Sequence, residues 1–199
     1  LKQFAELNTN FQVQIKDIKY LSDKEIYQIK KIWNNTNDQE IASLSNNTIY
    51  QLFEKQVINT PDNIAVIHGS TNYTYTDLLV DSQWLSKYII KSCGFENIKK
   101  HSGKLIGILS EKGYNQVVGC LSIMQSGYGY LPLNLEWPVD RITNILNCGL
   151  VDTLLISRSE YEKIAKTRID FVNSYNLLII EDILNNFKDE KFKNELLSI

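Results

Sequence analysis

From residue 76 onward, short apolar runs alternate with segments whose apolar residues recur at helical spacing, and this alternation most limits the folds open to the chain. The apolar runs occupy 105–109, 128–133, 153–156 and 177–180. The segments between them repeat apolar residues every three or four positions, as amphipathic helices do. Parallel strands need helical crossovers, and strands that are apolar throughout need cover on both faces. The sequence therefore predicts an α/β fold with a mostly parallel sheet and helices on both faces.

Residues 45–75 add a capped helix and a hairpin ahead of this alternation. Thr48 and Gln51 have the spacing of a capping box, in which each side chain satisfies a free backbone N–H of the first turn. Pro61 ends the helix that they begin. Residues 64–75 then combine an apolar run, turn-forming residues and the alternating Tyr73 and Tyr75, which predicts two antiparallel strands.

Residues 1–44 differ from the rest of the chain. The alternation at 11–15 predicts a short strand, and Ser22 or Asp23 can cap a helix over the following apolar residues. A polar, turn-forming stretch follows that helix. We therefore expect residues 1–44 to be an appended interdomain linker and residues 45–199 to form the domain.

Charge and composition exclude several classes of protein. A net charge of −2 and a pI near 5.8 provide no excess of Lys and Arg for nucleic acid or an anionic membrane, so neither is expected as a partner. No apolar run approaches the ~18 residues that span a bilayer, and no signal sequence is apparent, which predicts a cytoplasmic protein. Cys93, Cys120 and Cys148 lie far apart without a CxxC pair and are expected to be buried thiols.

Motifs for nucleotide, metal or nucleophilic chemistry are missing from the sequence. No GxxxxGK followed by Ser or Thr is present, so no phosphate-binding loop is predicted. Residues 127–129 resemble the start of a dinucleotide fingerprint, but position 132 is Pro and the glycines precede a strand instead of a helix. His68 and His101 have no neighbouring metal ligands. We therefore predict no catalytic, cofactor-binding or metal-binding residues.

The segment 106–145 joins a strand, a helix, a strand, a proline turn and a second helix. Its centre, MQSGYGYLPLNL at 124–135, resembles the second core motif of non-ribosomal peptide synthetase adenylation domains, which belong to the adenylate-forming enzyme superfamily. Residues 73–78, YTYTDL, are similar to the first core motif of that family. Residues 137–141 also fit, with Trp137, Pro138, Asp140 and Arg141 where the family has tyrosine, proline, an acidic residue and arginine.

The chain departs from the second motif at individual positions. Asn134 replaces the usual aspartate and Leu135 the usual proline, while Ser126 and Gly129 replace alanines. We assign packing and turn-forming roles to the motif, with a left-handed helix end at Gly127, a buried strand at 130–133 and turns directed by its prolines. The motif residues given such structural roles are Tyr75, Asp77, Leu78, Gly127, Tyr130, Pro132, Asn134, Pro138 and Arg141.

The resemblance implies a partial N-terminal subdomain of an adenylation domain, ending before the phosphate loop. It also implies that residues 1–44 join an upstream condensation or cyclisation domain. A parent enzyme of this kind uses ATP and Mg²⁺ to convert an amino acid to an aminoacyl-adenylate. It then loads the acyl group onto the phosphopantetheine thiol of a downstream carrier domain. The expected partners are these domains and the remainder of the adenylation domain. The chain alone is expected to bind no cofactor and to be inactive.

Two other hypotheses stay open at this point. The chain could belong to a related acyl-CoA or aryl-acid ligase, or it could be a non-catalytic interaction module that retains the scaffold. If covering elements lie outside the chain, an apolar patch should be exposed on the sheet-facing residues of 105–156 and 177–180. Closed sheet faces would instead favour the interaction module.

Overall fold

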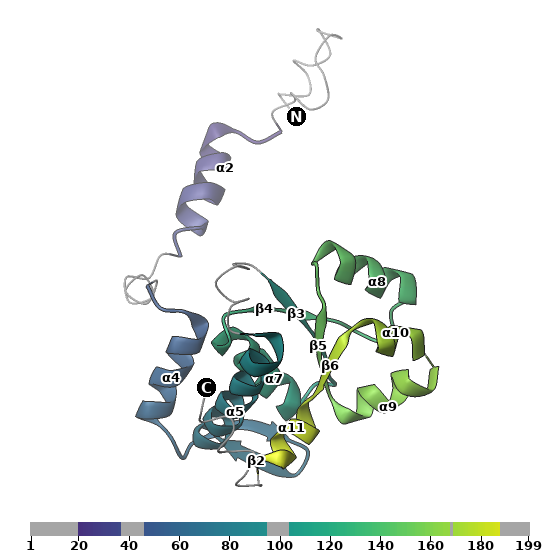
Figure 1. Cartoon of the computed structure of the whole chain (residues 1–199). Coiled ribbons are helices and arrows are strands. Elements are labelled where there is room, and N and C mark those ends of the chain that lie inside the picture. Colours follow the sequence, from purple (N-terminus) through teal and green to yellow (C-terminus); the bar gives the residue numbers. More distant parts are fainter. Residues whose placement is uncertain (1–19, 37–45, 95–103, 168, 188–199) are drawn as a thin grey trace. The chain divides into compact units, whose positions relative to one another are not determined.

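The computed structural model describes residues 20–36, 46–94, 104–167 and 169–187 (Figure 1). The chain divides into two compact units, Leu1–Asn46 and Asn47–Ile199. The strand predicted at 11–15 lies outside the described residues. The assignment of residues 1–44 as an interdomain linker stays a prediction.

In the first unit, the described helix begins at the predicted cap. Ser22 Oγ accepts the backbone N–H of Glu25, and the Glu25 carboxylate accepts the backbone N–H of Ser22 at 2.7 Å. This capping box starts α2 (Asp23–Tyr27), which continues as the π-helix η2 (Gln28–Trp33). The sequence indicated the helix but not its change to the wider π-helical hydrogen bonding.

The second unit opens with two capped helices that flank a hairpin. The predicted capping box of Thr48 and Gln51 starts α4 (Ile49–Asn59), and β1 (Ile64–His68) pairs antiparallel with β2 (Thr71–Thr74), as predicted. The assignment of Tyr75 to the second strand was wrong, because Tyr75 is the first residue of α5 (Tyr75–Cys93). A further capping box, formed by Thr74 and Asp77, ends the strand and begins this helix.

A four-stranded parallel sheet forms the centre of this unit, which confirms the predicted fold class. Its strands are β3 (Leu105–Leu109), β4 (Gly129–Pro132), β5 (Thr153–Ile156) and β6 (Asn176–Ile179), in the spatial order β4-β3-β5-β6. Each neighbouring pair is parallel. The connections and the C-terminal segment form α7 (Tyr114–Gln125), α8 (Val139–Cys148), α9 (Arg158–Thr167), α10 (Ile169–Ser174) and α11 (Ile180–Asn186).

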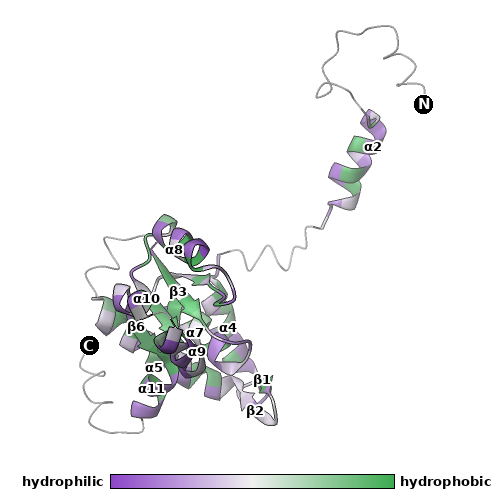
Figure 2. Cartoon of the chain, turned by 90° about the vertical axis from the view of Figure 1, so that its right-hand side faces the viewer, coloured by the Kyte–Doolittle hydropathy of each residue, from purple (hydrophilic) through white to green (hydrophobic). Residues whose placement is uncertain are grey.

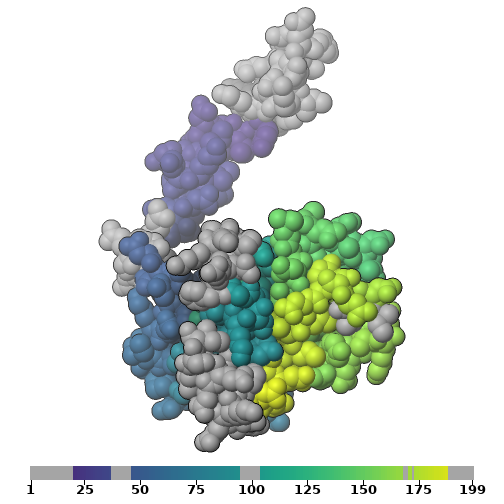
Figure 3. Space-filling model, in the orientation of Figure 1, coloured from purple at the N-terminus to yellow at the C-terminus, as the bar shows by residue number. Residues whose placement is uncertain are grey.

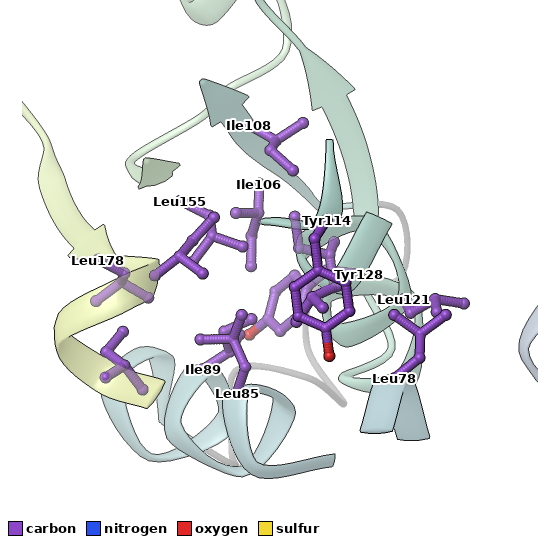
Figure 4. Close-up of a cluster of buried hydrophobic side chains, with 14 of the residues drawn as sticks. Leu78, Leu85, Ile89, Ile106, Ile108, Tyr114, Leu121, Tyr128, Leu155 and Leu178 are labelled. Carbon is purple, nitrogen blue, oxygen red and sulfur yellow. The ribbon is translucent and has the colours of Figure 1, made fainter. Parts of the chain in front are cut away.

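Helices cover both faces of the sheet. Figure 1 shows α5, α7 and α11 on one side and α8, α9 and α10 on the other, while Figure 2 shows hydrophobic residues concentrated along the strands between them. Side chains alternate along each strand, so Ile106, Ile108 and Leu155 join the first core and Leu154 and Ile156 the second. Figure 4 shows the first core, where strand side chains point toward Leu85 and Ile89 of α5.

The expected apolar patch on the sheet faces is therefore wrong. Ile106 and Ile108 are 1% exposed, and Leu154, Leu155 and Ile156 are fully buried. The helices of the chain itself provide the cover that parallel strands require. This unit therefore packs a core on each side of its sheet, which is the outcome expected for the interaction module. A subdomain of a larger enzyme that packs its own cores gives the same result, so closed faces do not separate these two hypotheses.

The strand at 130–133 is an edge strand and not the buried strand predicted. Among the described strands, β4 pairs with β3 alone, and Tyr130 is 42% exposed. Pro132 is also exposed, whereas Leu133, just beyond the strand, is buried. An edge position tolerates a proline because the outer side of the strand needs no N–H donor.

Pro138 and Gly149 bound α8. Pro138 is the N-cap, so Val139 is the first helical residue, and Gly149 is the C-cap. At the other end the left-handed residue is Leu150, with φ 50°, while Gly149 is right-handed with φ −82°. A Cβ on Gly149 would lie 3.2 Å from Val151 Cγ2, so close packing favours glycine there. The prediction of three buried thiols was wrong, because Cys148, in the last turn, is exposed and Cys93 and Cys120 are half-buried.

Candidate functional site

The carboxyl ends of the parallel strands β3, β4 and β5 lie at the same end of the sheet. Backbone hydrogen bonds continue past the strands there, from Leu133 N–H to Ile108 O at 3.0 Å and from Ser157 N–H to Leu109 O at 2.9 Å. The loops that follow these strands consequently begin side by side. A crevice of about 1030 Å³ opens between them.

The strand order places the crevice at a topological switch point. The chain passes from β3 to β4 on one side and then crosses to β5 on the other side of β3. The loops after β3 and β5 therefore lead to helices on opposite faces of the sheet, α7 and α9. Ligands of open α/β sheets bind outside the carboxyl ends of strands at such a point. This crevice is the candidate functional site.

The first wall of the crevice is the loop from Ser110 to Gly113, which the hairpin supports. A Cβ on Gly113 would lie 2.8 Å from His68 Nε2, so the loop packs closely against that ring. The next residue, Tyr114, stacks on Tyr73 of β2 with ring centroids 3.7 Å apart and donates its hydroxyl to Asp81 at 2.8 Å. Burial, followed by this hydrogen bond, raises the pKa of Tyr114. The hydroxyl thus stays protonated and fixes the start of α7.

The second wall is the start of α9, and an ion-pair cluster joins it to the first. Lys163 Nζ lies 2.6 Å from Glu111 Oε1 and 2.7 Å from Glu160 Oε1. Hydrogen bonding to Lys163 lowers the pKa of the Glu111 carboxyl, and the same bonds raise the pKa of Lys163. The Lys163 ammonium is therefore neutralised by two carboxylates of the same crevice.

The first-motif residues support the wall without entering the crevice. Asp77 completes the capping box of α5, Leu78 is buried at 3% exposure, and the Tyr75 ring lies 6.3 Å from that of Phe53. These contacts hold the hairpin against the helix that follows it.

The second-motif residues form the other side of the site. Gly127 has φ +82° and ends α7 as predicted, while the exposed Tyr130 and Pro132 belong to the edge strand. Asn134 Oδ1 accepts the N–H of Glu136 at 2.8 Å, and the Arg141 guanidinium lies 4.5 Å from the Trp137 ring centre. Of the nine motif residues given structural roles, all within the described part of the chain, Asn134 alone lines the crevice, where it lies between Leu133 and Leu135 of the same motif.

The prediction missed the charged residues of the second wall. Glu160 and Lys163 stood in a segment described only as a helix between two strands. Their position in the sequence was the one indication. Glu160 and Lys163 follow the carboxyl end of an apolar strand, and parallel sheets bind ligands at such strand ends.

The described residues form no metal centre and no membrane span. Among them, no group of three or more His, Cys, Asp or Glu side chains is placed to hold a metal ion. Nor, within the same residues, is any helix long and apolar enough to cross a membrane.

Several peptide synthetases are similar to the chain in sequence. It is 32% identical over 132 residues to bacitracin synthase 3 of Bacillus licheniformis and 33% identical over 111 residues to gramicidin S synthase 1 of Brevibacillus brevis. These matches cover 66% and 56% of the chain but only 2% and 10% of the relatives. The chain thus corresponds to a small part of these proteins.

Solved structures share the fold. The nonribosomal peptide synthetase FmoA3 in its AMPPNP-bound form has a TM-score of 0.64 at 17% identity, covering 92% of the chain and 19% of FmoA3. The N-terminal subdomain of Klebsiella oxytoca NpsA, in complex with 3-hydroxyanthranilyl-AMSN, has a TM-score of 0.54 at 19% identity. That match covers 69% of the chain and 31% of the solved subdomain. The family described as AMP-binding enzyme matches residues 53–195, most of the second unit, and the chain therefore belongs to the AMP-binding enzyme family.

Proposed function

We propose that the chain is the N-terminal part of an amino-acid adenylation domain of a non-ribosomal peptide synthetase. In the proposed reaction, the carboxylate of an amino acid attacks the α-phosphate of ATP, giving an aminoacyl-adenylate and pyrophosphate. The acyl group then moves to the phosphopantetheine thiol of a carrier domain. The observation that carries this proposal is the family match over 53–195, which includes both core motifs and the crevice at the switch point.

The described residues of the crevice do not by themselves fit ATP and Mg²⁺. Three lysines line the crevice, Lys112, Lys163 and Lys166, against four glutamates, Glu111, Glu136, Glu160 and Glu162. Lys163 is paired with Glu111 and Glu160, so the lining offers a triphosphate no net positive charge. Triphosphate binding commonly uses the backbone N–H groups of a glycine-rich loop, and the sequence contains no such motif. We therefore assign nucleotide binding to other segments of the adenylation domain, and to this chain the scaffold of one side of the active site.

The proposed partners follow from the same assignment. The remainder of the adenylation domain completes the site, a carrier domain receives the acyl group, and residues 1–44 connect to an upstream condensation or cyclisation domain. Carrier binding has a parallel in the artificial fusion of an adenylation and a PCP domain, NpsA-ThdA from Klebsiella oxytoca, which matches the chain with a TM-score of 0.53.

The decisive experiment is amino-acid-dependent exchange of pyrophosphate into ATP, measured on the polypeptide that extends this sequence through a complete adenylation domain. We expect exchange with one or a few amino acids. Exchange that depends on an aryl or fatty acid would instead support the acyl-CoA or aryl-acid ligase hypothesis. A complete domain that binds no nucleotide and supports no exchange would favour the interaction module.

For the 199-residue chain alone, we predict no tight nucleotide binding. Calorimetric titration with ATP and Mg²⁺ measures it, with the complete adenylation domain as the positive control. Micromolar affinity of the short chain would contradict the assignment of phosphate binding to other segments.

A further inference from the structure

Glu181 joins the two walls of the crevice from outside it. It is the second residue of α11 and follows β6, the strand next to β5. Figure 3 shows the surface of this β6 and α11 region (yellow) between the teal and green parts of the second unit. One carboxylate oxygen, Oε1, accepts the Asn115 side-chain amide at 2.7 Å, and the other, Oε2, accepts the Arg158 backbone N–H at 2.7 Å.

Both donors stand at the beginning of a helix that follows a crevice loop. Asn115 is in the first turn of α7, directly after the wall at 110–113, and Arg158 is the first residue of α9. The N–H groups of a first helical turn have no partner within the helix. A carboxylate near two helix amino termini is also favoured by their dipoles, and hydrogen bonds to a charged acceptor are the stronger kind. Glu181 therefore binds the first turns of both α7 and α9 with one side chain.

The neighbouring residue, Asp182, provides a natural comparison. Its carboxylate pairs with the Arg158 guanidinium, which also lies 5.4 Å from the Tyr161 ring centre. Asp182 thus contacts only the α9 wall, whereas Glu181 contacts both. The two acidic residues have the same charge and similar partial burial, so they differ mainly in what they connect.

We propose that Glu181 is a positioning residue that fixes the spacing between the walls of the crevice. Its bridge from Asn115 to Arg158 runs parallel to the Glu111 and Lys163 ion pair, which joins the same two walls through exposed side chains. Partly buried bonds to backbone and amide donors resist solvent and salt better than an exposed ion pair does. The consequence for catalysis rests on the proposed function, because a site assembled between segments depends on each wall being in place.

The first test uses hydrogen–deuterium exchange on the 199-residue chain with the variants Glu181→Gln, Asp182→Asn and Asn115→Ala. A glutamine has one uncharged acceptor oxygen, so one of the two bonds is lost and the other loses the strength that the charge gave it. Glu181→Gln should therefore raise exchange about tenfold or more at both 110–115 and 157–161. Asp182→Asn should affect only 157–161, and Asn115→Ala only 110–115. Faster exchange throughout the second unit, or an effect of Glu181→Gln limited to one wall, would overturn the proposal. If Glu181→Gln does not fold, the Asn115→Ala and Asp182→Asn pair still tests whether the walls respond separately.

The second test measures pyrophosphate exchange in the complete adenylation domain. Glu181→Gln should lower kcat about tenfold with a much smaller change in KM, because misplaced walls impair alignment more than binding. Asp182→Asn should stay within about twofold of the wild type. An active wild type with an equally active Glu181→Gln variant would refute the positioning role. An inactive wild type would refute the proposed function instead and leave the exchange-protection result as the test of the bridge.

Discussion

The two faces of the parallel sheet are packed by different means. On the first face, α5 and α7 approach closely through small residues, including the buried Ser82, Ser86, Ser122 and Ser126. On the second face, α8 and α9 present large aliphatic side chains, such as Ile142, Leu146 and Ile164, to the strands. Both faces also contain glycines in close contact, among them Gly119 on a helix of the first face and Gly107 on a strand facing the second. Small side chains between the helices thus contribute to the packing of the first face, and large aliphatic side chains to that of the second.

The largest expected effect tests whether the two faces contribute comparably to the free energy of unfolding. Leu85→Ala on the first face and Leu146→Ala on the second each remove a fully buried side chain. Each should lower the free energy of unfolding by about 2–5 kcal/mol, from lost burial and the cavity that remains. Urea denaturation followed by circular dichroism measures both, with the exposed Leu150→Ala as the control. A loss below about 1 kcal/mol for Leu146→Ala would mean that the second face adds little to stability.

Replacing Gly107 or Gly119 with alanine should lower the free energy of unfolding by different amounts on the two faces. A Cβ on Gly107 would lie 2.3 Å from Leu154 Cδ2, and one on Gly119 would lie 2.7 Å from Ile108 Cδ1. Overpacking of this kind costs about 1–3 kcal/mol. In α7, alanine recovers about 1 kcal/mol of helix propensity, a gain that a strand does not provide. Gly107→Ala should therefore be the more destabilising in the same denaturation assay, and the reverse order would contradict this account of the packing.

A smaller effect is expected from the serine cluster between α5 and α7. Ser126 Oγ donates to Ser122 O at 2.6 Å and lies 3.0 Å from Ser86 Oγ. Ser126→Ala should cost about 1–2 kcal/mol, because the buried Ser86 hydroxyl loses a partner. The double variant Ser86→Ala with Ser126→Ala should cost less than the sum of the single variants. Strict additivity in this double-mutant cycle would show that the two hydroxyls act independently.

The smallest effect concerns the charged rim that both faces share at the crevice. Lys163 lowers the pKa of Glu111, so this pair contributes stability above the ordinary carboxyl pKa of 4.5, and the contribution is lost as the pH falls through the lowered value. In Lys163→Met the Glu111 pKa should return toward 4.5. Carbon-detected NMR titration of the Glu111 carboxyl measures this, with Lys166→Met as the control. An unchanged Glu111 pKa would mean that the ion pair does not form in solution.

The fold was predictable because its signals are local. The capping boxes at Thr48 and Ser22, the apolar run at 105–109 and the left-handed glycine at 127 each depend on a few neighbouring residues. Tyr75 shows the limit of such signals. The alternation of Tyr73 and Tyr75 predicted a strand, whereas the overlapping capping box at Thr74 begins a helix at Tyr75.

The features that escaped prediction depend on the order of strands in space. β4 lies at the edge of the sheet and exposes Tyr130 because the chain crosses over β3 before it forms β5. No local sequence pattern encodes this crossing. The pairing of Lys163 with Glu111 joins a residue of α9 to a residue of the loop after β3 for the same reason. Glu181 is a further case, since its partners lie 66 and 23 positions away in sequence. Sequence patterns therefore located the scaffold, while the site needed the tertiary structure.

The strand order β4-β3-β5-β6 also has a consequence for synthesis on the ribosome. After β3 and β4 have emerged and paired, one edge of β3 still lacks its partner, because β5 is supplied only at Thr153–Ile156. During that interval the nascent chain presents the unpaired edge of the apolar strand Leu105–Leu109. Unpaired apolar edges promote misassembly between growing chains. Translation through α8 is thus the interval in which chaperone capture would protect this chain most.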